Sequence, residues 1–165
     1  MPAILPGRSL ILSTPIGAAL AIRSDGERIV DAEFTSARKE TRPHDALSRE
    51  IAAQVRAYFR HRLDRFDLPL YFDGSEFERA IWQLVSHLHT GELISYGDVG
   101  RALGRPRTHR AVAAAMRNTP IDLFIPAHRV VGADGRVKGA GPRSLRRRLL
   151  EFEGFTVAPD NAIRA

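Results

Sequence analysis

The sequence predicts an α+β protein, with a small N-terminal strand-plus-helix domain and a helical C-terminal domain that contains a helix-turn-helix. Three observations support this fold class. Short apolar runs separated by turn residues fill the first part of the chain, helical spacing dominates the second part, and Asp73-Gly74 lies between them. A chain of 165 residues is long enough for a small domain packed on a second one. We therefore expect one domain over residues 1–73 and another over residues 74–165.

The N-terminal elements follow from turn residues and from the spacing of apolar side chains. Pro15-Ile16-Gly17 and Asp25-Gly26 separate three short apolar runs. These runs predict strands at residues 9–13, 18–23 and 29–34. Apolar residues at helical spacing then predict a helix over residues 45–60, and the run Leu68 to Phe72 predicts one more strand.

The C-terminal helices begin at capping residues. Ser75-Glu76-Phe77-Glu78 is a capping box, and the apolar side of the helix that it opens is expected to be core. Ser95 and Thr108 are predicted to cap the two helices of the helix-turn-helix. The predicted helices lie at residues 75–88, 95–104, 108–117 and 144–153. Asp134-Gly135 predicts the turn of a small hairpin.

The composition favours nucleic acid as a partner and excludes cysteine chemistry. The net charge is +6, and only Lys39 and Lys138 among the 25 basic residues are lysines. Arginine offers a planar fork of donors that suits phosphates and base edges, although an Arg-rich genome with solvated surface charge would give the same count. The chain has no cysteine, which excludes disulfides, thiolate chemistry and cysteine-based zinc sites.

No window approaches the roughly 18 unbroken apolar residues of a membrane span. The first seven residues contain Pro and Gly and lack a basic leader, so they do not resemble a signal peptide. We expect a cytoplasmic monomer that binds no membrane, metal or cofactor.

The segment Phe124 to Val131 contains Pro126-Ala127-His128-Arg129 and resembles the active-site signature of the methylated-DNA–protein-cysteine methyltransferases. Other motifs follow in the order and spacing of that family. They are Thr14-Pro15-Ile16-Gly17, Tyr58-Phe59, Phe66 to Leu70, Gly74 to Trp82, Ser95-Tyr96, Gly104-Arg105-Pro106 and Arg110-Ala111-Val112. The resemblance covers about residues 10–155. It implies a ribonuclease-H-like α/β domain over 1–73 and a DNA-binding alkyltransferase-like domain over 74–165.

The resemblance also implies a way of binding DNA. The family docks a helix-turn-helix in the minor groove and rotates the damaged base out of the stack. Arg110 matches the intercalating arginine and Tyr96 matches the tyrosine that helps turn the nucleotide. Small residues let the second helix approach the groove closely, which gives the expected DNA-binding set of Tyr96, Arg110, Ala111, Ala114 and Arg117. Taken alone, the alanines would equally indicate helix propensity and tight packing.

The acceptor position carries the main departure from the family. Ala127 stands where the family has the cysteine that takes up the alkyl group, so this chain has no nucleophile there. His128 and Glu153 match the histidine and glutamate that activate the cysteine, and His128 could instead order a hydrogen-bond network. The expected base pocket consists of Tyr96, Pro126, Ala127, Val130, Val131 and Ala140.

The sequence shows three further departures from the family pattern. Gly139-Ala140-Gly141 replaces the usual Gly-Tyr-x-Gly, which predicts a roomier pocket. Thr119 stands in place of an asparagine that normally reaches the glutamate, and His89-Thr90-Gly91-Glu92 lacks the usual proline before its glycine.

These features favour a DNA-repair protein that binds duplex DNA with alkylated guanine, flips the base and transfers nothing. Such a complex could flag the lesion for proteins of another repair pathway. One alternative is a methyltransferase with an engineered Cys→Ala substitution at position 127. Another is a protein that binds DNA without lesion preference, mainly through salt-dependent phosphate contacts.

Overall fold

The computed structural model describes residues 9–36, 38–138 and 144–165, and it confirms the α+β fold class. The chain divides into two compact units. The first contains residues 1–73 and 120–124, and the second contains residues 74–119 and 125–165. A five-residue segment from the second half of the chain therefore belongs to the first unit.

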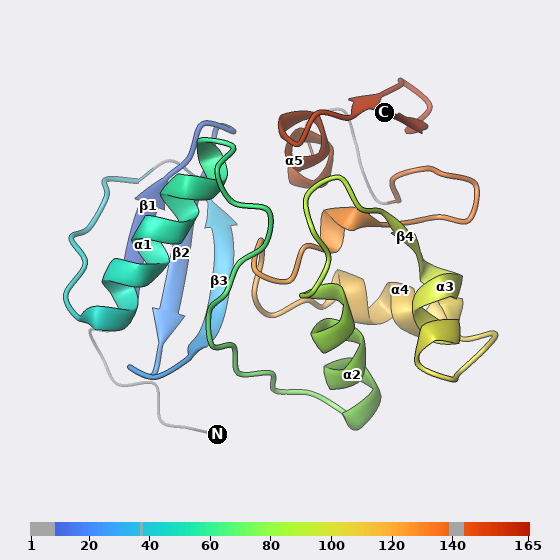
Figure 1. Ribbon diagram of the computed structural model, residues 1–165, viewed down its shortest axis with the longest axis horizontal. Helices are drawn as coiled ribbons and strands as arrows, with labels where there is room; N and C mark the ends of the chain where they lie inside the picture. The colour runs from blue at the N-terminus through green and yellow to red at the C-terminus, as the bar shows by residue number, and fades with distance from the viewer. Residues whose placement is uncertain (1–8, 37, 139–143) are drawn as a thin grey trace. The chain divides into compact units, whose positions relative to one another are not determined.

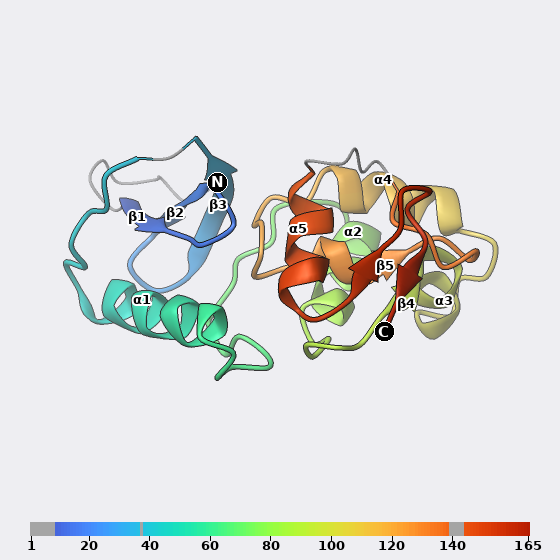
Figure 2. The same cartoon turned by 90° about the horizontal axis from the view of Figure 1, so that it is seen from above.

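The first unit is built on a three-stranded antiparallel meander. Its strands are β1 (Ser9–Ser13), β2 (Ala19–Ser24) and β3 (Ile29–Thr35), in the order β1-β2-β3. Alternate residues such as Leu10, Leu12, Leu20 and Ile22 are buried, as expected for a sheet with one covered face. Helix α1 (Ala46–Phe59) lies across that face in both views (Figures 1 and 2).

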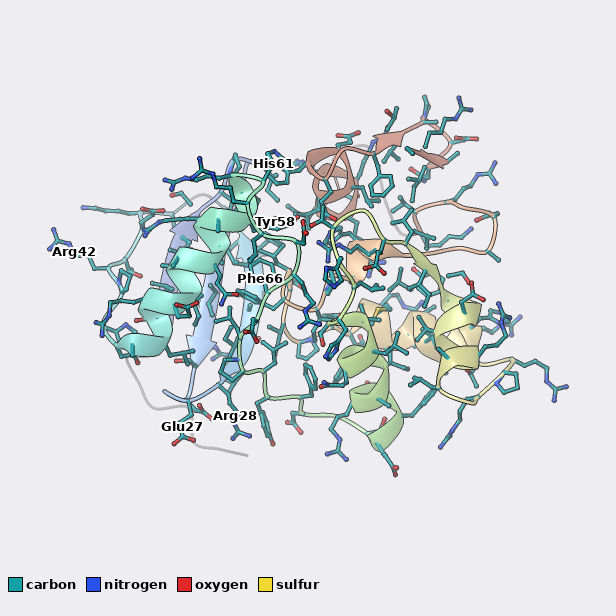
Figure 3. All side chains as sticks on the ribbon, viewed as in Figure 1. Glu27, Arg28, Arg42, Tyr58, His61 and Phe66 are labelled. Atoms are coloured by element: carbon teal, nitrogen blue, oxygen red, sulfur yellow. The ribbon has the colours of Figure 1, made fainter. Side chains whose placement is uncertain are left out.

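An aromatic group follows the end of α1. The Tyr58 ring lies 5.4 Å from that of Phe66, and the Phe66 ring lies 4.9 Å from that of Phe124. Figure 3 labels Tyr58 and Phe66, which lie side by side where the chain leaves the helix. Phe124 reaches this group because Asp122 donates its N–H to Ala32 O at 2.8 Å, which holds the segment 120–124 against β3.

The predicted strand over residues 68–72 is wrong. Only Leu70 forms a bridge, in parallel with Ile29, through Ile29 N to Pro69 O at 2.8 Å and Tyr71 N to Ile29 O at 2.9 Å. Proline has no N–H to donate, so Pro69 prevents a longer ladder at this edge.

The second unit is mainly helical. Helix α2 (Glu76–Val85) begins at the predicted capping box, in which Ser75 and Glu78 cap each other. Helices α3 (Tyr96–Ala102), α4 (His109–Arg117) and α5 (Leu145–Phe152) complete the set in the described residues. The buried Trp82 indole donates to Ala115 O at 3.0 Å and thereby fixes α2 against α4. Helix α2 is shorter than predicted, because the chain turns at Ser86 and Leu88 packs beyond its end.

The second unit also contains two pairs of short strands. β4 (Ile94–Ser95) pairs in parallel with β5 (Val130–Val131), and β6 (Thr156–Val157) pairs with β7 (Ile163–Arg164) in antiparallel fashion. The predicted turn at Asp134-Gly135 is present, closed by Gly132 N to Arg136 O at 2.9 Å. No helix in the described ranges is both long enough and apolar enough to cross a membrane.

Candidate functional site

Helices α3 and α4 form a tight helix-turn-helix (Figure 1). The turn packs directly on Gly100 of α3, where a Cβ atom would lie 2.3 Å from Thr108 Oγ1 and 2.8 Å from Arg105 O. Gly104 and Arg107 take positive φ values of 72° and 61° and reverse the chain. The predicted side-chain cap at Thr108 is absent. Its hydroxyl instead donates to Arg105 O at 2.6 Å, so it stabilises the turn and does not cap helix α4.

Helix α4 has two chemically different faces. Val112, Ala115 and Met116 are buried in the unit. A second face carries residues at the spacing i, i+1, i+4 and i+8, which lie on one side of a helix. These residues are His109, Arg110, Ala113 and Arg117, and they line a pocket of about 640 Å³.

The pocket collects positive charge from three segments of the second unit. Its described lining residues are Tyr96, His109, Arg110, Ala113, Arg117, Lys138 and Arg146. These include four permanent cations and no carboxylate, although Lys138 also pairs with Asp134 at 3.0 Å outside the lining. Arginine-rich hollows with an aromatic hydroxyl suit phosphates and base edges.

The structure brings three of the five sequence-predicted DNA-binding residues to this pocket. Tyr96, Arg110 and Arg117 line it, whereas Ala111 is exposed and Ala114 is half-buried outside the lining. Among the described residues, Ala113 is the alanine of α4 that faces the pocket. Helical spacing from Arg110 could have indicated Ala113 and Arg117 together. Lys138 and Arg146 come from distant segments, and no local signal in the sequence places them here.

Ala127, which stands at the expected acceptor position, lies on a short 3₁₀ turn, η1 (Ala127–Arg129). Ala127 N donates to Ile125 O at 2.8 Å, and Arg129 N donates to Pro126 O at 2.9 Å. This turn leaves Ala127 half-buried and sends the next two side chains inward. Pro126, Val130 and Val131 of the expected base pocket are buried around it, and Ala140 lies outside the described residues.

His128 and Arg129 converge on Glu153, at the end of α5. Arg129 Nε lies 2.8 Å from Glu153 Oε1, and its terminal nitrogens reach Leu88 O at 2.7 Å and Thr90 Oγ1 at 3.2 Å. His128 Nε2 contacts Glu153 Oε2. His128 and Arg129 are only 2% and 3% exposed, so this is a buried polar network whose members bind one another.

Burial sets the charge states in this network. Desolvation lowers the pKa of His128, and the neighbouring Glu153 opposes that shift only in part. Burial alone would raise the pKa of Glu153, but hydrogen bonds from His128 and Arg129, together with the positive charge of Arg129, outweigh it and lower the pKa to about 2. At neutral pH, Glu153 is therefore anionic and His128 neutral. Neutral His128 can donate from Nε2 to Glu153 and keep a lone pair on Nδ1.

Two other predicted departures are visible. Thr119 stands at the position of the family's asparagine, and its hydroxyl donates to Met116 O at 2.8 Å near the end of α4. Thr90 takes part in the Arg129 contacts described above. Within the described ranges, no group of three or more His, Asp or Glu side chains is placed to hold a metal ion.

Comparison with known proteins gives a consistent relationship. The family profile described as "6-O-methylguanine DNA methyltransferase, DNA binding domain" matches residues 76–155. A curated relative from Methanosarcina acetivorans, named methylated-DNA–protein-cysteine methyltransferase, is 32% identical over 151 residues, which cover 87% of this chain and 96% of that protein. A relative of the same name from Mycobacterium leprae is 35% identical over 131 residues, covering 79% of both proteins.

Solved structures show the same similarity over most of the chain. The crystal structure of Mycobacterium tuberculosis OGT in complex with DNA is 30% identical and superposes with a TM-score of 0.74 over 92% of each chain. The crystal structure of the O6-methylguanine methyltransferase from the same organism is 28% identical, with a TM-score of 0.76 over 94% of each chain.

Proposed function

The chain belongs to the methylated-DNA–protein-cysteine methyltransferase family, and we propose that it binds duplex DNA carrying alkylated guanine without taking up the alkyl group. The observation that carries this proposal is a contrast within one unit. The helix-turn-helix presents a cationic pocket with Tyr96 and Arg110, while the acceptor position holds the methyl group of Ala127.

The pocket residues have different roles in the proposed recognition of the lesion. Arg117 and Lys138 are exposed cations that neutralise phosphates on either side of the lesion. Arg110 is exposed near the start of α4, where its side chain can enter the base stack and replace the extruded nucleotide. Tyr96 lies at the first turn of α3 and guides the rotating nucleotide toward the segment Pro126 to Val131.

Transfer requires an atom that this chain lacks. In-line attack on the alkyl carbon needs a lone pair held close to it, and an alanine methyl has none. The two methionines are poor substitutes, because Met116, for example, is buried in the core of the unit. The flipped base is therefore held and released chemically unchanged, which lets the complex serve as a signal for other repair proteins.

A duplex-binding comparison tests this proposal. Two duplexes of identical sequence, one with O6-methylguanine and one with guanine at the same position, are titrated with the protein at about 150 mM salt, since phosphate contacts depend on salt. We expect at least about tenfold tighter binding to the lesion, since each lost specific contact typically costs a factor of this size. Equal affinity for the two duplexes would overturn lesion recognition.

Binding without lesion preference is separated from base flipping by two variants. Arg110→Ala removes the proposed intercalating side chain, whereas Arg148→Ala removes an arginine of α5 outside the pocket lining. We expect Arg110→Ala to weaken lesion binding by about 10- to 100-fold and Arg148→Ala by less than about threefold. Equal losses in the two variants would favour general phosphate binding.

An active methyltransferase is the second candidate, because the relatives carry that name and the network of His128 and Glu153 is complete. It requires a cysteine at position 127 in the natural protein. Reading the natural codon at that position decides it: a cysteine codon supports the enzyme, and an alanine codon excludes it.

A further inference from the structure

Arg146 extends from α5 toward the ends of two other helices. One terminal nitrogen lies 2.9 Å from Met116 O, near the C-terminal end of α4. The other lies 3.5 Å from the Tyr96 hydroxyl, at the start of α3. Its side chain is half-buried and lines the same pocket as both helices. A single guanidinium therefore joins the three helices that surround the pocket.

The bond to Met116 O fixes one end of this arrangement. The last carbonyls of a helix have no partner within the helix, and a cation there also interacts favourably with the helix dipole. The hydroxyl of Thr119 donates to the same carbonyl at 2.8 Å. The guanidinium is thereby anchored at the end of α4 that also carries Arg117.

The contact with Tyr96 is at the outer limit of a hydrogen bond. Tyr96 is 8% exposed, so its ring is held by packing while its hydroxyl faces a cation that is already anchored. A long contact of this kind orients the hydroxyl without locking it, and it can shorten when a ligand enters the pocket. The hydroxyl is then aligned relative to α4, the helix that carries Arg110.

The charge of Arg146 also reaches the acceptor segment. It acts on the buried His128 and contributes to the lowering of the pKa of that imidazole. Arg146 thus influences both the open pocket and the buried network, although it belongs to neither of the sequence motifs that define them.

We infer that Arg146 is a positioning residue for lesion recognition, which aligns the Tyr96 hydroxyl with the DNA-facing side of α4. This inference rests on the proposed function and adds to it the residue that couples the two helices. Arginine suits the role because it offers two separate nitrogens to two acceptors. A lysine at this position keeps the charge but has one nitrogen, so it cannot make both contacts in the same geometry.

The test uses charge-preserving variants of two arginines of helix α5. Arg146→Lys removes the double contact, and Arg148→Lys is the matched control, since Arg148 lies on the same helix outside the pocket lining. We expect Arg146→Lys to reduce the ratio of lesion to undamaged affinity by about tenfold, the size of one lost charge-assisted hydrogen bond, and Arg148→Lys to change that ratio by less than about twofold.

Two further readouts separate positioning from a merely structural role. The fluorescence of a 2-aminopurine placed beside the lesion reports base extrusion at saturating protein, and we expect its increase to be smaller for Arg146→Lys. In a double-mutant cycle, Arg146→Lys should have at most about a threefold effect on the affinity ratio once Tyr96→Phe has removed the hydroxyl. Additive losses in the cycle, or an unchanged affinity ratio in Arg146→Lys, would overturn the inference.

Failure of the inference differs from failure of the proposed function. If the wild-type protein does not prefer the lesion, the proposed function is wrong, and the inference that rests on it falls with it. If the wild type prefers the lesion and Arg146→Lys prefers it equally, the proposed function holds and Arg146 has no positioning role.

Discussion

Two regions of the second unit differ in exposure and in chemistry. The pocket beside α4 is open and cationic, with Arg110 and Arg117 exposed. The network of His128, Arg129 and Glu153, called here the closed network, is buried and hydrogen-bonded. It follows directly after Ala127, whose methyl side chain cannot react with an alkyl group. Under the proposed function, recognition and transfer depend on separate sets of residues, so one set can be kept while the other loses its reacting atom.

Restoring the acceptor gives the largest expected effect. Ala127→Cys places a thiol next to neutral His128, whose Nδ1 lone pair can take up the thiol proton through a water molecule. The thiolate sulfur then bonds to the alkyl carbon as the carbon–O6 bond breaks. The electron pair of the broken bond stays on guanine O6. We expect a stoichiometric alkyl gain, measured by intact-protein mass spectrometry. Ala127→Ser is the control and should gain nothing. No gain in Ala127→Cys would show that the network serves structure alone.

Breaking the closed network tests its contribution to stability. Arg129→Met keeps the volume but leaves Glu153 as an uncompensated buried charge, which should cost about 3–5 kcal/mol of unfolding free energy. Arg23→Met is the control, since the Arg23 and Asp31 side chains are 47% and 33% exposed and such pairs contribute less than about 1 kcal/mol. Urea unfolding measures both. Similar losses in the two variants would contradict a special role for the buried pair.

Acid should destabilise the closed network. The pKa of Glu153 is lowered from 4.5 to about 2, so its contribution is complete above about pH 5 and is lost as the pH falls toward 2. The pKa of His128 is also lowered, so the unfolded chain takes up that proton first and acid again favours unfolding. Together they should steepen the loss of stability below about pH 6.5, with Glu153 contributing about 3 kcal/mol.

Urea unfolding of the wild type and of Glu153→Gln at a series of pH values measures this effect. In the variant, the free energy of unfolding should no longer fall with pH below about pH 5 through the titration of residue 153. Parallel pH profiles for the two proteins would show that Glu153 titrates normally in the folded state.

The smallest expected effect concerns the scaffold of the pocket. Gly100→Ala drives a methyl group into the turn, 2.8 Å from Arg105 O, and should cost about 1–3 kcal/mol of stability together with DNA affinity. Gly97→Ala on the same helix meets only the flexible end of Arg101, at 3.4 Å, and should be neutral or slightly stabilising. Thermal unfolding and duplex titration compare the two. Equal behaviour would mean that the close approach at Gly100 is unimportant.

Local signals in the sequence predicted the elements well. The Ser75 capping box, the three strands β1 to β3 and the two helices of the helix-turn-helix were predicted from capping residues, turn residues and periodicity, although the expected Thr108 cap is absent. The strand expected over residues 68–72 failed because Pro69 cannot donate to a ladder. The spacing of apolar side chains does not show whether the backbone has the N–H donors that a strand needs.

Long-range assembly of the site was harder to predict. The resemblance indicated Tyr96, Arg110 and His128, but Arg146 and Lys138 reach the pocket only through the fold. Residues 120–124 likewise join the first unit through backbone hydrogen bonds to Ala32, which no sequence pattern encodes. Contacts between distant segments depend on how elements pack, so a single sequence leaves them open.

The most direct test of the central claim is the intact mass of the wild-type protein recovered from a saturated complex with an O6-methylguanine duplex. We predict that the complex forms and that the protein mass is unchanged after prolonged incubation, because Ala127 offers no acceptor. A gain of one methyl group per protein would contradict the account.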